Sequence, residues 1–392
     1  MLQHTYYFDN AATTKISKEV IDSMQPYLNE IYGNASSIYS IGRETKKAIE
    51  VAREKVAKAI NADSNEIYFS GSGTEADNWA IKGIAFANQH KGKHIITTNI
   101  EHHAVLHTCE YLEKFGFETT YVPVKENGIV DVNDIKGATR EDTILISVML
   151  ANNEIGTIQP IKEIGELAKE KNIYFHTDAV QTIGNIPVDV KELNVDLLSL
   201  SAHKFHGPKG VGALYVRNGV NIDNLLHGGG QEKRRRASTE NIAGIVGLGT
   251  AIEIATKDIP KKAEYLKTLR EKTINGLTEN IPEIIVNGDR EKRLPGNVNV
   301  CFKYIEGESI LLHLDQYGIC ASSGSACTSG SLEPSHVLLA IGLPHEIAHG
   351  SLRLSFSEEN TEEEVDYLLE KLPPIITNLR NMSPLYKKPT KL

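Results

Sequence analysis

From about residue 66, the sequence alternates short runs rich in β-branched residues with longer stretches whose apolar residues lie three or four positions apart. This alternation is typical of helices that cross over a mainly parallel sheet, so it predicts an α/β fold. The strands are expected at residues 66–70, 94–99, 118–122, 143–149, 173–177, 196–201 and 212–216. The helices between them are expected at residues 74–89, 104–115 and 161–171.

The order of the elements changes after the seventh expected strand. The later pattern gives two long amphipathic segments, a strand, a helix, a short strand and a final helix, the longest of them at 243–255, 261–277, 296–302 and 361–379. This order predicts a second, smaller α+β domain. We expect a large α/β domain over residues 15–257 and a small domain formed by residues 1–14 and 258–392.

The overall charge and the cysteine content exclude several classes of protein. The 392 residues carry 42 Lys and Arg against 51 Asp and Glu, a net charge of −9 without a long basic run, so neither nucleic acid nor a membrane surface is an expected partner. No stretch approaches the roughly 18 uncharged apolar residues that cross a bilayer, and residues 1–10 lack the features of a signal peptide. The four dispersed cysteines do not form a disulfide scaffold. We therefore expect a cytoplasmic protein in which any important cysteine acts as a thiol.

A polar patch containing Ser201, His203 and Lys204 follows one of the expected strands and ends in a Gly/Pro turn. Ligands gather at the carboxyl ends of strands in sheets of this kind. An amine held there in a partly dry pocket loses its proton more readily and can attack a carbonyl, so Lys204 is a candidate for Schiff-base chemistry. The alternative for a single lysine is a solvated surface charge.

Polar residues also follow four other expected strands. Asp178 ends one strand, where a carboxylate can hold a proton on a ring nitrogen or cap a helix. Gly73 and Thr74 open a helix, where backbone N–H groups suit a phosphate. His102 precedes another helix, where an imidazole can stack on a planar ligand, and Asn153 belongs to a polar cluster or a loop cap after the strand expected at 143–149.

Four polar clusters and a lysine at one edge of a sheet fit a single anionic, aromatic cofactor with a reactive carbonyl. Pyridoxal 5'-phosphate (PLP) needs a lysine for its Schiff base, a carboxylate to keep its pyridine protonated, a stacking ring and a phosphate cradle. The sequence therefore predicts PLP. His103 and His107 have a spacing that zinc sites use, but no HExxH glutamate lies between them, so no resident metal is expected.

Two further features belong to the second half of the chain. Residues 322–334 are almost wholly Ser, Gly, Ala and Thr around Cys327, so we expect a mobile loop, about 321–334, with an accessible thiol that acts as a nucleophile or carries a group. An ordinary loop cysteine is the alternative. Arg353 alternates with apolar neighbours, so its guanidinium either faces a carboxylate from a strand or lies on the surface.

Together these blocks resemble the cysteine desulfurases of the nitrogen-fixation and iron–sulfur-cluster type, in the class V aminotransferase group of fold-type I PLP enzymes. The match runs nearly end to end, from Phe8-Asp-Asn-Ala-Ala-Thr-Thr14 through Tyr32-Gly-Asn-Ala-Ser-Ser37 to Arg235-Arg-Ala-Ser-Thr-Glu-Asn241. The stretch SSGSACTSGSLEPSHVL, residues 322–338, discriminates best because it is similar to the long catalytic loop of the first desulfurase group.

The resemblance implies a homodimer and a role for each cofactor residue. Lys204 would form the Schiff base, Asp178 would meet the pyridine nitrogen, and His102 would stack on the ring. The remaining cofactor residues would be Gln181 near the phenolic oxygen, Asn153 near the ring, and Gly73, Thr74, Ser201, His203 and, from the partner subunit, Thr239 at the phosphate.

The resemblance also implies the reaction. L-cysteine would be converted to L-alanine, with Arg353 and Asn153 at the substrate and His102 as a candidate base. Cys327 would accept the sulfur as a persulfide, pass it to an iron–sulfur scaffold or another acceptor protein, and be a possible transient ligand of a nascent cluster. Selenocysteine lyase and class V aminotransferase are the alternative activities, and a non-catalytic scaffold that binds a sulfur carrier is a third alternative.

Overall fold

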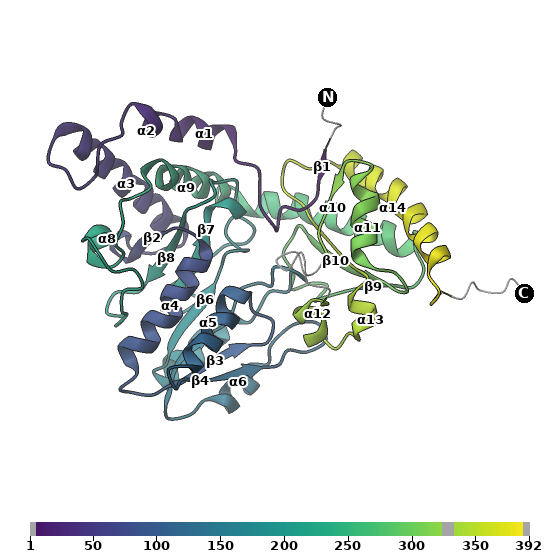
Figure 1. Cartoon of the computed structure of the whole chain (residues 1–392), viewed down its shortest axis with the longest axis horizontal. Coiled ribbons are helices and arrows are strands. Elements are labelled where there is room, and N and C mark those ends of the chain that lie inside the picture. Colours follow the sequence, from purple (N-terminus) through teal and green to yellow (C-terminus); the bar gives the residue numbers. More distant parts are fainter. Residues whose placement is uncertain (1–4, 324–332, 387–392) are drawn as a thin grey trace, which may run out of the picture.

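The computed structural model describes residues 5–323 and 333–386, and its largest element is a seven-stranded sheet (Figure 1). The strand order is β2-β8-β7-β6-β5-β3-β4, in which β8 is antiparallel to both neighbours and the other pairs are parallel. The mixed, mainly parallel sheet predicted from the sequence is therefore confirmed. The strands are β2 (Ile67–Ser70), β3 (His94–Thr98), β4 (Glu118–Val122), β5 (Thr143–Ser147), β6 (Tyr174–Asp178), β7 (Leu197–Ser201) and β8 (Gly212–Val216).

Helices cover both faces of this sheet because its strands are apolar on both sides. In β2, for example, Tyr68 packs into one hydrophobic cluster while Ile67 and Phe69 pack into another. The first cluster also holds side chains from α4 (Gly73–Asn88) and α5 (His103–Glu113). The second holds side chains from α3 (Ser40–Ala59), α7 (Ile161–Lys171) and α9 (Ile242–Ala255).

Helix α3 was not predicted from the sequence, although it has 20 residues. Its buried face carries Ile49, Ala52, Val56 and Ala57 at the three- and four-residue spacing of an amphipathic helix, so the signal for this helix was present in the sequence. The shorter helices around the large sheet are α1 (Lys18–Met24), α2 (Pro26–Asn29), α6 (Val132–Ala138) and α8 (Gln231–Arg234).

A separate hydrophobic core lies in the C-terminal part of the chain. Strands β9 (Ile284–Val286), β10 (Asn297–Phe302) and β12 (Ser351–Ser355) form an antiparallel sheet in the order β12-β10-β9. The helices of this part are α10 (Ile259–Asn280), α11 (Gly307–Asp315), α12 (His336–Ala340), α13 (His345–Ala348) and α14 (Glu362–Met382). Figure 1 shows this part beside the large sheet with its helices.

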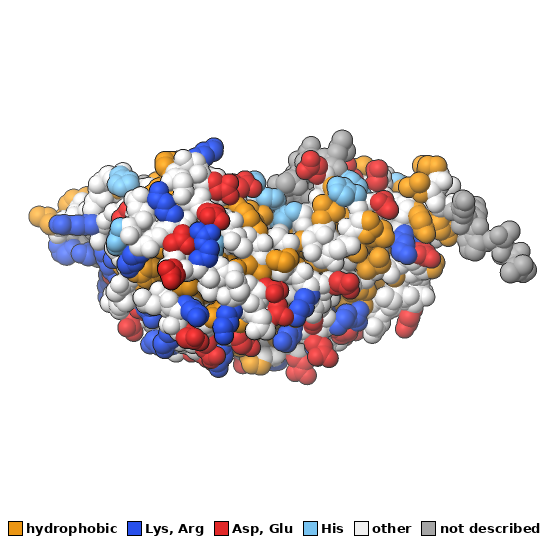
Figure 2. Space-filling view, turned by 90° about the horizontal axis from the view of Figure 1, so that it is seen from below, with side chains coloured by type: hydrophobic (Ala, Val, Ile, Leu, Met, Phe, Trp, Pro, Cys, Tyr) orange, Lys and Arg blue, Asp and Glu red, His pale blue; other side chains and the backbone are white. Residues whose placement is uncertain are grey.

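The N-terminal segment joins this C-terminal part rather than the large sheet. Strand β1 (Tyr6–Tyr7) pairs in parallel with β11 (Ile319–Cys320), and Phe8 is fully buried in the same cluster as α10 and α14. Acidic and basic side chains are interspersed over the face of the molecule in Figure 2. In the part of the chain that the structure describes, no helix is long and apolar enough to cross a bilayer.

Candidate active site

A cavity of about 320 Å³ lies at the carboxyl ends of the parallel strands and brings ten of the predicted site residues together. The loops after β2, β3, β5, β6 and β7 and the strand β12 all contribute to it. The predicted residues on its wall are Gly73, Thr74, His102, Asn153, Asp178, Gln181, Ser201, His203, Lys204 and Arg353.

Lys204 ends a short 3-10 turn, Ala202–Lys204, directly after β7. Its ammonium Nζ donates hydrogen bonds to the carbonyl oxygens of Ala11, at 2.6 Å, and Ala12, at 2.9 Å. Both carbonyls belong to the N-terminal segment, which also accepts a hydrogen bond from Gln181 Nε2 at Ala11 O, 2.9 Å away. The lysine is therefore directed into the cavity by backbone carbonyls of a segment about 190 residues earlier in the chain.

Asp178 is the last residue of β6, and its carboxylate is buried in the cavity wall. Burial raises the pKa of this carboxyl to about 6, against the opposing effects of the Val180 backbone N–H, which donates to Oδ1 at 2.8 Å, and of the Lys204 charge. A carboxyl at this position can accept a hydrogen bond from a protonated ring nitrogen, whose positive charge would favour the ionised carboxylate.

Replacing Asp178 with asparagine is expected to stabilise the ligand-free chain at pH 8 by up to about 3 kcal/mol, because one pKa unit is worth about 1.4 kcal/mol. Folding raises the pKa of this carboxyl, so the native state holds the proton more tightly than the unfolded chain does. The stability that this carboxyl contributes is therefore fully present below about pH 4 and is lost as the pH rises through about 6. Urea unfolding at pH 5 and pH 8 measures the difference, which should be larger at pH 8. The exposed Asp22→Asn is the control, and an equal gain at both pH values contradicts the prediction.

The N-terminus of α4 forms another part of the cavity wall. Ser72 caps the helix by accepting from the Glu75 N–H, at 3.1 Å, whereas the first N–H groups of a helix have no acceptor within the helix. A Cβ at Gly73 would lie 2.7 Å from Val180 Cγ2 and 3.3 Å from Ser201 Cβ, so only glycine lets the helix start this close to the cavity. Such a helix end is suited to a phosphate.

His102 is the N-cap of α5, and its Nδ1 accepts a hydrogen bond from the Ala104 N–H at 3.1 Å. Burial, together with the Lys204 charge and the neighbouring histidines, lowers the pKa of this imidazole to about 4. The ring is therefore neutral at pH 7. A neutral, buried ring on the cavity wall suits stacking, whereas the low pKa makes it a weak base toward a thiol.

Arg353 lies on β12 with only 2% of its side chain exposed, so it is not the surface arginine that was the alternative. Its Nη1 donates to the Asn153 carbonyl oxygen and its Nη2 to Asp9 Oδ1, both at 3.0 Å. Its buried Nε has no hydrogen-bond partner among the described residues. Buried N–H groups are rarely left without a partner, which is consistent with an anionic ligand in this cavity.

Two buried carboxyl groups beside Asp178 were not predicted from the sequence. Asp77 lines the cavity from the buried face of α4, and burial and the Asp178 charge raise its pKa well above the usual range. Glu101 accepts from Thr98 Oγ1 at 2.6 Å, and burial raises its pKa to about 8. For Asp77, the sequence held a signal, because an aspartate within the apolar stripe of a helix indicates a buried carboxyl.

One predicted site residue in the described part of the chain lies away from the cavity. Thr239 is exposed and does not line it. Cys327 and most of the predicted catalytic loop, 321–334, lie outside the described residues. Within residues 5–323 and 333–386, no group of three or more His, Cys, Asp and Glu side chains could hold a metal ion. The rings of His103 and His107 contact each other at an angle of 38°, with centroids 4.9 Å apart.

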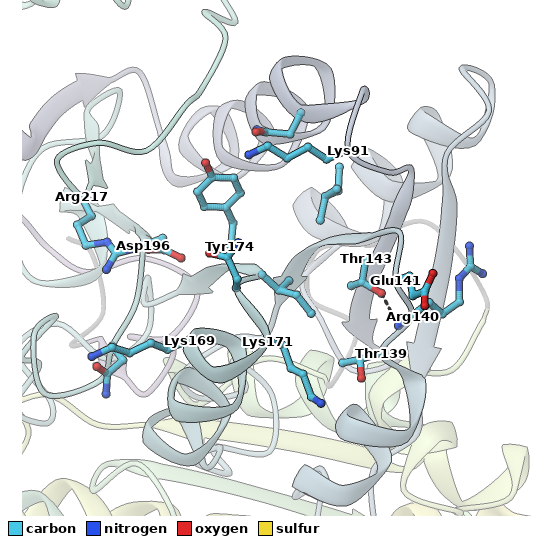
Figure 3. A pocket seen from close by; sticks show the side chains of 15 residues that line it. Lys91, Thr139, Arg140, Glu141, Thr143, Lys169, Lys171, Tyr174, Asp196 and Arg217 are labelled. Atoms are coloured by element: carbon cyan, nitrogen blue, oxygen red, sulfur yellow. Dashed lines mark hydrogen bonds and ion pairs between the residues drawn. The ribbon is translucent and has the colours of Figure 1, made fainter.

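A larger cavity, of about 720 Å³, lies at the opposite end of the strands, where β5 and β6 begin (Figure 3). Its wall includes Lys169 and Lys171 from the last turn of α7, together with Tyr174 at the start of β6. Cations are favourable at helix C-termini, which explains these lysines without a ligand. None of the predicted site residues lines this cavity, so its size alone does not make it the active site.

The residues around the smaller cavity fit PLP. The cavity has a lysine and a buried carboxylate on its wall, a helix N-terminus pressed against it at Gly73, and an arginine Nε without a partner among the described residues. These groups meet the requirements of an aldehyde, a pyridine nitrogen and a phosphate, and they leave one cation for a substrate carboxylate.

Comparisons with known proteins agree with this geometry. The family described as aminotransferase class-V matches residues 6–368. A cysteine desulfurase IscS from Clostridium botulinum is 63% identical over 97% of this chain and 96% of its own, and another from Methanosarcina thermophila is 63% identical over 97% and 94%.

Solved structures give the same result. A NifS-like protein superposes with a TM-score of 0.91 at 42% identity, covering 96% of this chain and 100% of its own. A structure described as SspA in complex with cysteine superposes with a TM-score of 0.81 at 39% identity, covering 90% and 98%. The chain therefore belongs to the class V aminotransferase family and, within it, to the cysteine desulfurases.

Proposed function

We propose that this cysteine desulfurase binds PLP in the 320 Å³ cavity, converts L-cysteine to L-alanine and places the sulfur on Cys327 as a persulfide. The observation that carries the proposal is the convergence of Lys204, Asp178 and Arg353 on one cavity, because these are a carbonyl-reactive amine, a partner for a ring nitrogen and a partner for a substrate carboxylate. The cysteine bound in the SspA structure supports the choice of substrate.

Each predicted cofactor residue has a place in this proposal. Lys204 would carry the cofactor, Asp178 would hold its ring nitrogen and His102 would stack on its ring. When bound, PLP supplies an electron sink for the carbon that loses its proton. The other residues that would hold it are Gln181 at the phenolic oxygen, Asn153 near the ring, and Gly73, Thr74, Ser201 and His203 at the phosphate.

The chain's own residues would then act on the substrate. Arg353 binds and orients the carboxylate, with Asn153 beside it, and the Lys204 amine takes the proton from the α-carbon and returns a proton to the product. The Cys327 thiolate attacks the substrate sulfur, so a sulfur–sulfur bond forms while the carbon–sulfur bond breaks. The products are L-alanine and a persulfide on Cys327, with no net oxidation.

We further propose a homodimer, with Thr239 of each chain completing the phosphate site of its partner. Thr239 is exposed and does not line the cavity of its own chain, so its hydroxyl is available to a second copy. The persulfide sulfur would pass to an iron–sulfur scaffold or another acceptor protein. The same proposal includes Cys327 as a transient ligand of a nascent iron–sulfur cluster.

Product analysis tests the function. Purified chain loaded with PLP should form alanine and sulfide in equal amounts from L-cysteine when a thiol reductant is present. A class V aminotransferase would need a keto acid and release no sulfide, a selenocysteine lyase would form alanine from selenocysteine only, and a non-catalytic scaffold would form neither product. Any of these three results contradicts the proposal.

A further inference from the structure

The N-terminal segment from Phe8 to Ala12 takes a defined course along β12. The Ser355 N–H donates to Phe8 O at 2.7 Å, and the Ala11 N–H donates to Ser355 Oγ at 2.8 Å. Phe8 is fully buried and packs edge to face against Phe356, with ring centroids 5.4 Å apart. The position of the segment is therefore set by the core and by β12, independently of any ligand.

Asp9, within this segment, contacts the arginine proposed to bind the substrate. Asp9 Oδ1 accepts from Arg353 Nη2 at 3.0 Å, while Asn153 O accepts from Nη1 at 3.0 Å. A planar guanidinium that is held at both terminal nitrogens has a fixed plane as well as a fixed position. The Asp9 side chain is itself only 17% exposed, so solvent weakens this ion pair little.

The same segment also positions the lysine. The carbonyl oxygens of Ala11 and Ala12, two and three residues after Asp9, accept hydrogen bonds from Lys204 Nζ. An α-amino acid carries its amine and its carboxylate on one carbon, so a site that selects it needs a fixed separation between the two groups that meet them. Here one short segment contacts both Lys204 and Arg353.

We propose that Asp9 is a positioning residue that holds Arg353 in register with Lys204 and thereby makes the site selective for ligands with an α-carboxylate. The proposal rests on the function proposed above, because it assigns the substrate carboxylate to Arg353. Asp9 itself would contact no substrate atom. A general contribution of Asp9 to folding would affect the binding of every ligand, whereas the proposed role affects only ligands that carry a carboxylate.

Binding of two matched ligands to the PLP-loaded chain tests this. L-alanine and ethylamine differ only in the carboxylate, and calorimetry gives both dissociation constants without turnover. Asp9→Ala should weaken L-alanine binding about tenfold, the effect expected from losing a hydrogen bond between charged groups, and should change ethylamine binding by less than about twofold. Asp9→Glu should recover part of the loss, and Asp9→Asn covers the case in which the alanine variant does not fold.

The controls separate this inference from the function on which it rests. Asp22→Ala removes an exposed aspartate of the same N-terminal region and should leave both constants unchanged. If the Asp9 substitutions weaken L-alanine and ethylamine equally, so that the ratio of the two dissociation constants does not change, Asp9 has a merely structural role and the inference is overturned. A wild type that binds both ligands equally would also overturn it. Failure of the wild type to desulfurate L-cysteine would instead overturn the proposed function, since alanine binding is measured separately.

Discussion

A chain carrying Lys204→Ala is expected to lose about a thousandfold or more of its alanine production from L-cysteine, because proton transfer by a positioned group alone contributes roughly 10²–10⁴-fold. Lys204 is the one lysine on the wall of the cavity in the described part of the chain. Arg353, which also lines the cavity, carries a guanidinium and cannot replace an amine nucleophile. Initial rates at saturating L-cysteine and PLP measure the loss.

The control for this variant is Lys209→Ala, an exposed lysine five residues later that does not line the cavity. It should leave the rate unchanged. Added methylamine should restore part of the activity of Lys204→Ala, because the substitution removes the amine but leaves the cavity. If Lys204→Ala kept more than about a tenth of the wild-type rate, the proton transfer would belong to another group.

Most of the fold and much of the site could be predicted because both depend on local patterns. The seven strands of the large sheet begin and end within two residues of the predicted positions, since β-branched runs and turn residues mark them directly. Polar residues directly after such strands necessarily meet at one edge. Lys204 and Asp178, from two adjacent strands, therefore came together as expected.

The parts that could not be predicted depend on contacts between distant residues. Asp9 and Arg353 are 344 positions apart, and the carbonyls that hold Lys204 belong to alanines, whose side chains give no sign of this role. The place of Asp77 in the apolar stripe of α4 indicates burial, but its carboxyl becomes a site group only when α4 packs over the ends of the strands. The division into domains and the individual catalytic roles stay predictions.

The three cysteines in the described part of the chain are poor candidates for the sulfur acceptor. Burial raises the pKa of the Cys109 thiol to about 12 and that of Cys301 to about 11, and both side chains are fully buried. Burial and then the carboxylates of Asp315 and Asp9 also raise the pKa of the partly exposed Cys320 thiol. Because the thiolate is the nucleophile, all three are poor acceptors at neutral pH.

Cys327→Ala is therefore expected to abolish persulfide formation and to reduce alanine production from L-cysteine to the background of the protein-free reaction, while the absorbance of bound PLP stays intact. Cys320→Ala, seven positions earlier in the chain, is the matched control and should retain both activities. Persulfide labelling after a single addition of L-cysteine, followed by peptide mapping, measures the first effect, and alanine release measures the second. Loss of both in Cys327→Ala alone would assign the transfer to this thiol. Undiminished turnover would move the acceptor role to Cys320, because it is the least buried of the three remaining thiols, or to a different PLP reaction that needs no thiol.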